Sequence, residues 1–210
     1  MRGSLRPPAT PAYRVEILGE EIEVDSPLKG AHQHRNLALA MAAAVELNEG
    51  FGLPVSPQAI EAGIRKTRWP GRMERITGCG VDWILDVAHN PAGAWALRAG
   101  LKALLREGPP RTLIFSCLRD KPVAEMAQIL FPVFGRVIVA PIQSARAAAL
   151  GDLMEAARAT GVEAEAAESV REAIELAEAK TAGGTAVVCG SVYLVGEVRP
   201  LLAAGERGKP

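Results

Sequence analysis

Residues 81–91 have the sequence Val-Asp-Trp-Ile-Leu-Asp-Val-Ala-His-Asn-Pro. The first part, 81–87, is a short apolar run of the kind that forms a buried strand. Asn90 and Pro91 then favour the start of a helix, because an asparagine side chain can cap free backbone N–H groups and proline fits the first turn. We therefore predict a strand, a short polar loop and a helix, the basic unit of α/β proteins.

The same alternation of strand and helix continues towards the C-terminus. Further apolar runs predict strands at 112–116, 136–140 and 185–190. Helical patterns occur at 91–106, from about 122, at 152–161 and at 169–183, with a closing element at 193–202. Alternating strands and helices favour a parallel sheet that is covered on both faces. We predict an α/β domain with a Rossmann-like, mostly parallel sheet for residues 71–210.

Short polar signals mark several of the predicted helix starts. Each combines a side chain that can cap a helix with a suitable residue shortly after it. They are Ser56 with Pro57, Asn90 with Pro91, Asp152 with Glu155, and Ser169 with Glu172.

The N-terminal third has a different pattern. Alternating residues at 13–18 and 21–25 predict a hairpin, and helices are expected at 31–48 and at 57–67. The first helix is apolar on nearly every side, so we expect it to be largely buried. Trp69-Pro70-Gly71 then predicts a hinge. Residues 1–70 are therefore expected to lie outside the main sheet.

The amino-acid composition argues against some classes of binding partner. The 24 basic and 24 acidic residues balance, so there is no electrostatic reason to expect a nucleic-acid or membrane partner. No apolar run is long enough to span a bilayer. The cysteines, which are Cys79, Cys117 and Cys189, are few and far apart, so reduced thiols and a cytoplasmic location are expected.

The strongest candidate site is the loop at 86–90. In open α/β sheets, ligands bind beyond the carboxyl ends of the strands, near helix N-termini. Asp86 could accept hydrogen bonds from ribose hydroxyls, and His89 could contact a phosphate or a carboxylate. The alternative is that Asp86 and Asn90 only cap the turn. Arg72, after the hinge, suits phosphate or carboxylate binding, and the alternative is a solvated surface arginine.

Weaker candidates lie at other element ends. Asn36 belongs to a polar helix start, His32-Gln-His-Arg-Asn36, in which two histidines without a third ligand make a metal site unpromising. Ser191 follows the last predicted strand. The sequence contains no G-x-x-x-x-G-K-[ST] phosphate loop and no G-x-G-x-x-G after a strand. A dinucleotide site is therefore disfavoured.

Five motifs, in this order, resemble the folylpolyglutamate synthase and dihydrofolate synthase family of the Mur ligase superfamily. The motifs are Gly30-Ala-His-Gln-His-Arg-Asn36, Trp69-Pro-Gly-Arg-Met-Glu74, Leu85-Asp-Val-Ala-His-Asn-Pro91, Arg119-Asp-Lys121 and Gly190-Ser-Val-Tyr-Leu-Val-Gly-Glu197. Together they cover about residues 28–200. Val87 departs from the pattern, because the family usually has glycine there.

The resemblance implies an ATP-dependent ligase that adds L-glutamate to a folate through an acyl phosphate. Residues 1–70 would be the end of an ATP-binding central domain with its linker, and 71–210 the Mur ligase C-terminal domain. By resemblance, Asn36, Arg72 and Asp86 contact ATP, Asp86 and His89 take part in catalysis, and His89 and Ser191 bind substrate.

The resemblance also implies that the N-terminal ATPase domain, with its phosphate loop and the Mg²⁺ ligands, is missing. We therefore expect the isolated chain to be inactive and the helix at 31–48 to expose apolar surface that the missing domain would cover. Two other functions remain open: a non-catalytic nucleotide-binding or regulatory module on the same fold, and a fragment of a peptidoglycan-precursor Mur ligase. The ordered motifs favour the folate branch.

Overall fold

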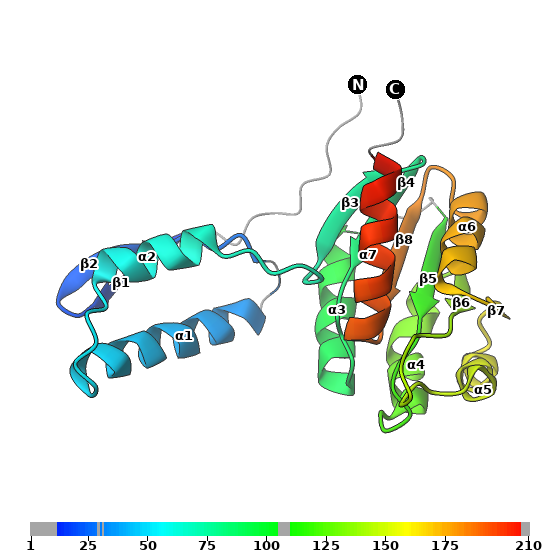
Figure 1. Cartoon of the computed structure of the whole chain (residues 1–210), viewed down its shortest axis with the longest axis horizontal. Helices are drawn as coiled ribbons and strands as arrows, with labels where there is room; N and C mark the ends of the chain where they lie inside the picture. The colour runs from blue at the N-terminus through cyan, green and yellow to red at the C-terminus, as the bar shows by residue number, and fades with distance from the viewer. Residues whose placement is uncertain (1–11, 29, 31, 105–109, 207–210) are drawn as a thin grey trace. The chain divides into compact units, whose positions relative to one another are not determined.

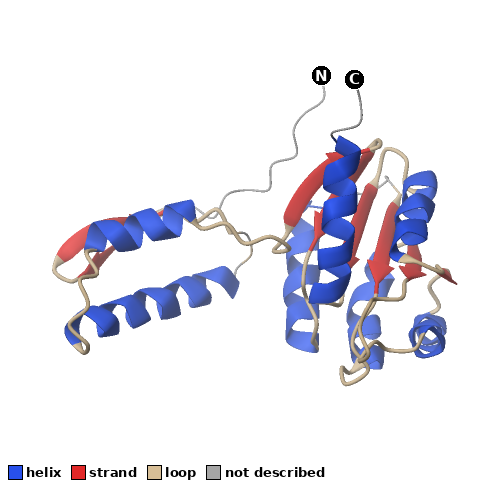
Figure 2. Cartoon of the chain, viewed as in Figure 1, coloured by secondary structure: helices blue, strands red, loops and turns tan. Residues whose placement is uncertain are grey.

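The backbone forms two separate β-sheets, a two-stranded one before the Trp69-Pro70-Gly71 segment and a six-stranded one after it. The computed structural model describes residues 12–28, 30, 32–104 and 110–206. It divides into two compact units between Trp69 and Pro70, inside the segment that the sequence marks as a hinge. Figures 1 and 2 show the elements of each unit.

The first unit contains a hairpin and two helices. Its elements are β1 (Tyr13–Ile17), β2 (Glu20–Val24), α1 (His32–Glu49) and α2 (Pro57–Lys66). The strands pair antiparallel, and Leu18 and Gly19 form the turn with positive φ angles of 52° and 79°. This confirms the predicted hairpin, which has no strand in common with the main sheet.

Helix α1 buries few of its side chains. Leu37 and Met41 join Ile60 and Ile64 of α2 in a small core against the hairpin. Leu39, in contrast, is 60% exposed and Leu47 is 42% exposed. The expectation that this helix is largely buried is therefore wrong for this chain, whereas the expected exposed apolar surface is present.

The second unit is built on a sheet with the strand order β3-β4-β8-β5-β6-β7. Its strands are β3 (Glu74–Gly78), β4 (Val81–Leu85), β5 (Arg111–Phe115), β6 (Arg136–Val139), β7 (Ala164–Ala166) and β8 (Thr185–Cys189). Only β3 runs antiparallel to its neighbour, and the other neighbours are parallel. The mostly parallel α/β sheet is thus confirmed.

Helices cover both faces of this sheet (Figure 1). They are α3 (Pro91–Leu104), α4 (Val123–Leu130), α5 (Leu150–Thr160), α6 (Val170–Lys180) and α7 (Val192–Glu206), with a 3-10 turn, η1 (Phe131–Val133), after α4. Side chains of α3, α4 and α5 form one apolar cluster, and those of α6 and α7 form the other. The predicted end of α3 near Arg106 lies outside the described residues.

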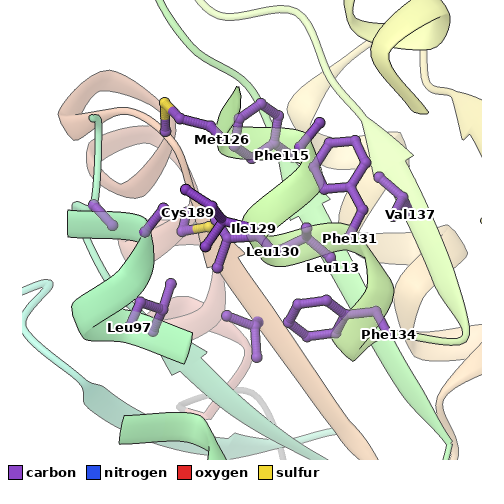
Figure 3. Close-up of a cluster of buried hydrophobic side chains, with 14 of the residues drawn as sticks. Leu97, Leu113, Phe115, Met126, Ile129, Leu130, Phe131, Phe134, Val137 and Cys189 are labelled. Carbon is purple, nitrogen blue, oxygen red and sulfur yellow. The ribbon is translucent and has the colours of Figure 1, made fainter. Parts of the chain in front are cut away.

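The larger apolar cluster lies under α3, α4 and α5. Figure 3 shows its centre, where Phe115 of β5 meets Phe131 edge-on with the ring centroids 5.1 Å apart. Phe115, Leu113 and Leu130 are completely buried. Burying an aromatic or branched side chain of this kind contributes about 1.5–3 kcal/mol, so this cluster is a main source of stability.

Helix caps agree with the sequence signals at three of four places. Ser56 Oγ accepts from Ala59 N, Asn90 Oδ1 accepts from Gly93 N, and Ser169 Oγ accepts from Glu172 N. The capping box expected at Asp152 is wrong, because α5 begins earlier and its N-cap is Ala149, without a side-chain hydrogen bond. Asp152 lies instead in the first turn, where its charge favours the helix dipole.

The end of β8 passes very close to the end of β5. Gly190 has a φ of 104°, and a Cβ atom placed on it would lie only 2.2 Å from the carbonyl oxygen of Ser116. Glycine is therefore required here both for backbone conformation and for space.

We predict that Gly190→Ala destabilises the fold by about 2–5 kcal/mol, from left-handed strain and from overpacking against Ser116. The matched control is Gly196→Ala in α7, where an added Cβ meets nothing within 4 Å. That change should be neutral or stabilise by about 0.5–1 kcal/mol, because alanine favours helix more than glycine does. Urea unfolding of both variants measures the difference, and equal midpoints would contradict it.

Candidate functional site

The helix after β8 packs on the opposite face of the sheet from the helices that follow its two neighbouring strands. Strand β4 leads into α3, which packs on one face, whereas its parallel neighbour β8 leads into α7, which packs on the other face. Strand β5, on the other side of β8, leads into α4 on the same face as α3. In sheets of this kind, ligands bind beyond the carboxyl ends of adjacent strands whose following helices pack on opposite faces. We call the region between the loops after β4 and β8 the crevice.

Hydrogen bonds join the loops on either side of this crevice. The backbone N–H of Asp86 donates to Val188 O at 3.0 Å and continues the sheet past the end of β4. The N–H of Gly190 donates to Ala88 O at 2.9 Å. The loop with Asp86 and His89 and the loop with Ser191 are therefore fixed against each other.

Asp86 binds two backbone segments at once. The residue is 7% exposed, its Oδ1 accepts from Ala88 N at 2.9 Å, and its Oδ2 accepts from Met73 N at 3.0 Å. One bond shapes its own loop, and the other holds the chain just after the hinge. Asp86 thus has a structural role, because it holds these two segments together. Carboxylate oxygens can each accept more than one hydrogen bond, so binding to a ligand stays compatible.

His89 has a defined tautomer. Its Nδ1 lies 2.9 Å from the carbonyl oxygen of Val87, and because a carbonyl only accepts, Nδ1 carries the hydrogen. The half-buried ring therefore has Nε2 as its second functional atom, an acceptor when neutral and a donor when protonated. Among the contacts of the described chain, Nε2 has no hydrogen bond.

Ser191 lies across the crevice from this loop. It is 2% exposed, and its Oγ accepts from Tyr193 N at 3.1 Å, which starts α7. The hydroxyl can still donate one hydrogen bond. The next two side chains, Val192 and Tyr193, are 58% and 49% exposed, so apolar surface lies beside the polar groups.

Arg72 is presented by a tight turn. Its neighbours Gly71 and Met73 both have positive φ angles, 71° and 49°. Val87 N donates to Gly71 O at 2.8 Å, so the turn lies directly on the loop after β4. The Arg72 side chain is half-buried and forms no hydrogen bond or ion pair within the described residues. A left-handed non-glycine residue such as Met73 is strained, and such strain occurs most often at functional sites.

Asn36 belongs to the first unit of the chain. It lies in α1 of the first unit, where its side chain is exposed and donates to Gln33 Oε1 at 2.9 Å. Arg72, Asp86, His89 and Ser191 all belong to the second unit and to three segments joined by hydrogen bonds.

A second polar cluster occupies the next loops along the carboxyl edge. Asp120 forms ion pairs with Lys121 at 3.1 Å and with Arg146 at 2.8 Å. The hydrogen bonds from Lys121 and Arg146 hold the pKa of Asp120 below its usual value. Arg119 also links these loops, since its N–H donates to Arg146 O. The cluster is satisfied by its own members and leaves a net positive charge beside the crevice.

The buried cysteines are unsuited to nucleophilic chemistry. Burial, with Asp120 nearby, raises the pKa of Cys117 to about 11. Burial also raises the pKa of Cys189 well above its ordinary value. Because the thiolate is the reactive form, both residues act as core side chains.

Two contacts near the site had no signal in the sequence. Arg199 pairs with Glu74 although 125 positions separate them, and Arg146 reaches Asp120 from the loop after the next strand. Glu74 itself is part of a motif, but a partner on a distant helix is visible only in three dimensions.

The arrangement suits a ligand with phosphate and hydroxyl groups. An arginine without a partner in the described chain can bind a phosphate, a carboxylate can accept from hydroxyls, and a serine can donate to a carboxylate or phosphate oxygen. No group of three or more His, Cys, Asp or Glu side chains that could hold a metal ion occurs among the described residues. No helix in that part of the chain is long and apolar enough to cross a membrane.

Known proteins match this chain over most of its length. Residues 71–192 match the family described as Mur ligase, glutamate ligase domain. Folylpolyglutamate synthase of Lacticaseibacillus casei is 32% identical over 188 residues, which cover 90% of this chain and 42% of that protein.

Solved structures agree. Mycobacterium tuberculosis folylpolyglutamate synthase complexed with ADP and AMPPCP has a TM-score of 0.75 and 30% identity, over 95% of this chain and 45% of that chain. Escherichia coli FolC in complex with DHPP and ADP has a TM-score of 0.69 and 32% identity, over 88% of this chain and 42% of that one.

This chain spans less than half the length of these relatives. The family match covers more than half of the chain itself, and all strands of the six-stranded sheet lie within it. The chain therefore belongs to the Mur ligase family, with a glutamate ligase domain at residues 71–192, and it resembles the folylpolyglutamate synthases within that family.

Proposed function

We propose that this chain is the C-terminal part of an ATP-dependent ligase that adds L-glutamate to a folate. The observation that carries the proposal is the grouping of Arg72, Asp86, His89 and Ser191 around the crevice between β4 and β8. Relatives with ADP, AMPPCP or DHPP bound support nucleotide and folate substrates for the complete enzyme.

In the proposed reaction, ATP first phosphorylates the folate carboxylate, and the amine of glutamate then displaces the phosphate to form the amide. The half-buried Arg72 would neutralise phosphate charge, which arginine does well through its planar guanidinium. Asp86 would accept from the ribose while it holds the loops in place. Catalysis of this kind depends mainly on positioning and on stabilising charge.

His89 and Ser191 are proposed to bind the glutamate. The Nε2 atom of His89, when protonated, can donate to a carboxylate, and the Ser191 hydroxyl can do the same. Asn36 is proposed as a further ATP ligand, contributed by the first unit. Mg²⁺ would accompany ATP, but the described residues contain no cluster of acidic or imidazole groups fit to hold it. By resemblance to the family, we assign its ligands to the N-terminal ATPase domain of the complete enzyme.

The exposed apolar side chains of the first unit support a contact with that domain. Besides Leu39 and Leu47, Phe51 is 71% exposed and Leu53 is 47% exposed. Apolar side chains at this density on one short unit usually mark an interface. We propose that residues 12–69 pack against the ATPase domain, of which they are the last segment.

We predict that the isolated chain binds ADP weakly, with a dissociation constant near the millimolar range, because it has no phosphate loop. In a ¹⁵N NMR titration, the Nε–Hε signal of Arg72 and the backbone signals of His89 and Ser191 should shift together. Arg72→Gln should abolish binding, whereas the matched control Arg68→Gln, on the other side of the hinge, should not. ADP-dependent shifts confined to other parts of the chain would show that the site is wrongly assigned.

We further predict that Asp86→Ala removes ADP binding and also lowers the free energy of unfolding by about 2–4 kcal/mol, because two buried charge-assisted hydrogen bonds are lost. The control is Asp82→Ala on β4, the strand that precedes Asp86; its 3.5 Å ion pair with Arg75 is partly exposed. That change should cost less than about 1 kcal/mol. Thermal unfolding and the ADP titration together decide. Normal ADP binding by a destabilised Asp86→Ala chain would restrict Asp86 to a structural role.

A further inference from the structure

We propose that Glu74 and Arg199 are positioning residues, which hold the turn at residues 71–73 so that Arg72 faces a nucleotide phosphate. The inference rests on the proposed function, in which Arg72 binds ATP. It adds two residues whose side chains need not touch the ligand and which act through the backbone that carries Arg72.

Three hydrogen bonds fix the backbone of the turn at residues 71–73. The N–H of Gly71 donates to Glu74 Oε2 at 2.9 Å, the carbonyl of Gly71 accepts from Val87 N, and the N–H of Met73 donates to Asp86 Oδ2. A Cβ on Gly71 would lie 2.9 Å from Val87 Cγ1 and 3.0 Å from Val195 Cγ1. The backbone therefore lies closely between the β4 loop and α7, and the residue between Gly71 and Met73 is Arg72.

Glu74 connects this turn to α7. One carboxylate oxygen accepts from Gly71 N, and both oxygens accept from Nε of Arg199, at 2.9 and 3.0 Å. Arg199 lies in the middle of α7, and Ser191 directly precedes the first residue of that helix. A single helix thus fixes the backbone on both sides of the crevice, next to Ser191 through its start and next to Arg72 through Arg199.

This ion pair adds little to stability. The side chains of Arg199 and Glu74 are 45% and 21% exposed, and partly exposed pairs are strongly screened by water. The pair instead fixes the conformation of the turn, because Met73 has a left-handed conformation that a non-glycine residue seldom adopts without restraint. Loss of the pair should therefore affect ligand binding much more than folding.

The test uses this chain and ADP, observed through the Nε–Hε signal of Arg72. Glu74→Ala removes both the ion pair and the acceptor for Gly71 N, and Arg199→Ala removes the ion pair alone. Glu74→Gln keeps an acceptor for Gly71 N. The matched control is Arg136→Ala, which breaks the 2.9 Å pair with Glu163 near the opposite edge of the same sheet.

We expect Glu74→Ala to weaken ADP binding about fivefold or more, and Arg199→Ala and Glu74→Gln to weaken it less, as the loss of one or two hydrogen bonds implies. The melting temperature should fall by less than about 4 °C in each case. Arg136→Ala should bind ADP like the unaltered chain.

Two other results would overturn the proposal. If Glu74→Ala and Arg199→Ala bind ADP normally, the pair does not position Arg72, although the proposed ATP site stands. If the unaltered chain shows no ADP-dependent shift at Arg72, the proposed site itself fails, and the positioning role fails with it. The two failures are distinguishable, because the first appears only in the variants and the second already in the unaltered chain.

Discussion

The arrangement of the crevice depends on one carboxylate, that of Asp86, which accepts hydrogen bonds from two backbone N–H groups 15 positions apart, Ala88 and Met73. A buried carboxylate is costly unless its oxygens are satisfied. Asp86 therefore requires the turn after the hinge and the loop after β4 to lie together. Because Arg72 lies in this turn and His89 lies in this loop, both residues are placed at the same crevice. Their proposed roles depend on this placement.

Further contacts join these two segments to the loop after β8, and we call the connected set the frame. Gly190 can approach Ser116 closely only because it has no side chain, and its N–H then binds Ala88 O. The helix that follows carries Arg199, which returns to the hinge turn through Glu74. All contacts of the frame lie within the second unit. In the proposed ligase, these contacts would keep this domain's half of the site in place.

Most strands and helices and the candidate site residues of the second unit could be predicted from the sequence, because local patterns of residues determine strands, helices and loops. The run 81–91 predicted β4, its loop and α3, and strand-end polarity singled out Asp86, His89 and Ser191. Strand β3 was missed because Glu-Arg-Ile-Thr-Gly contains one large apolar residue, and β7 because it has only three residues. The dual bonding of Asp86 and the partner of Glu74 were out of reach, since both depend on strand order and on segments distant in sequence. The sequence motifs indicated the family, whereas the hydrogen bonds and ion pairs between distant segments are seen only in the structure.

Asp86 holds two separate segments together at the crevice. Hydrogen–deuterium exchange of individual backbone amides tests this role most directly, in the unaltered chain and in Asp86→Ala, with buried amides of β5 such as Leu113 as the reference. We predict that Met73 and Ala88 N–H groups are protected in the unaltered chain and lose protection together in Asp86→Ala, while the reference amide stays protected. Undiminished protection of either amide in Asp86→Ala would contradict the claim.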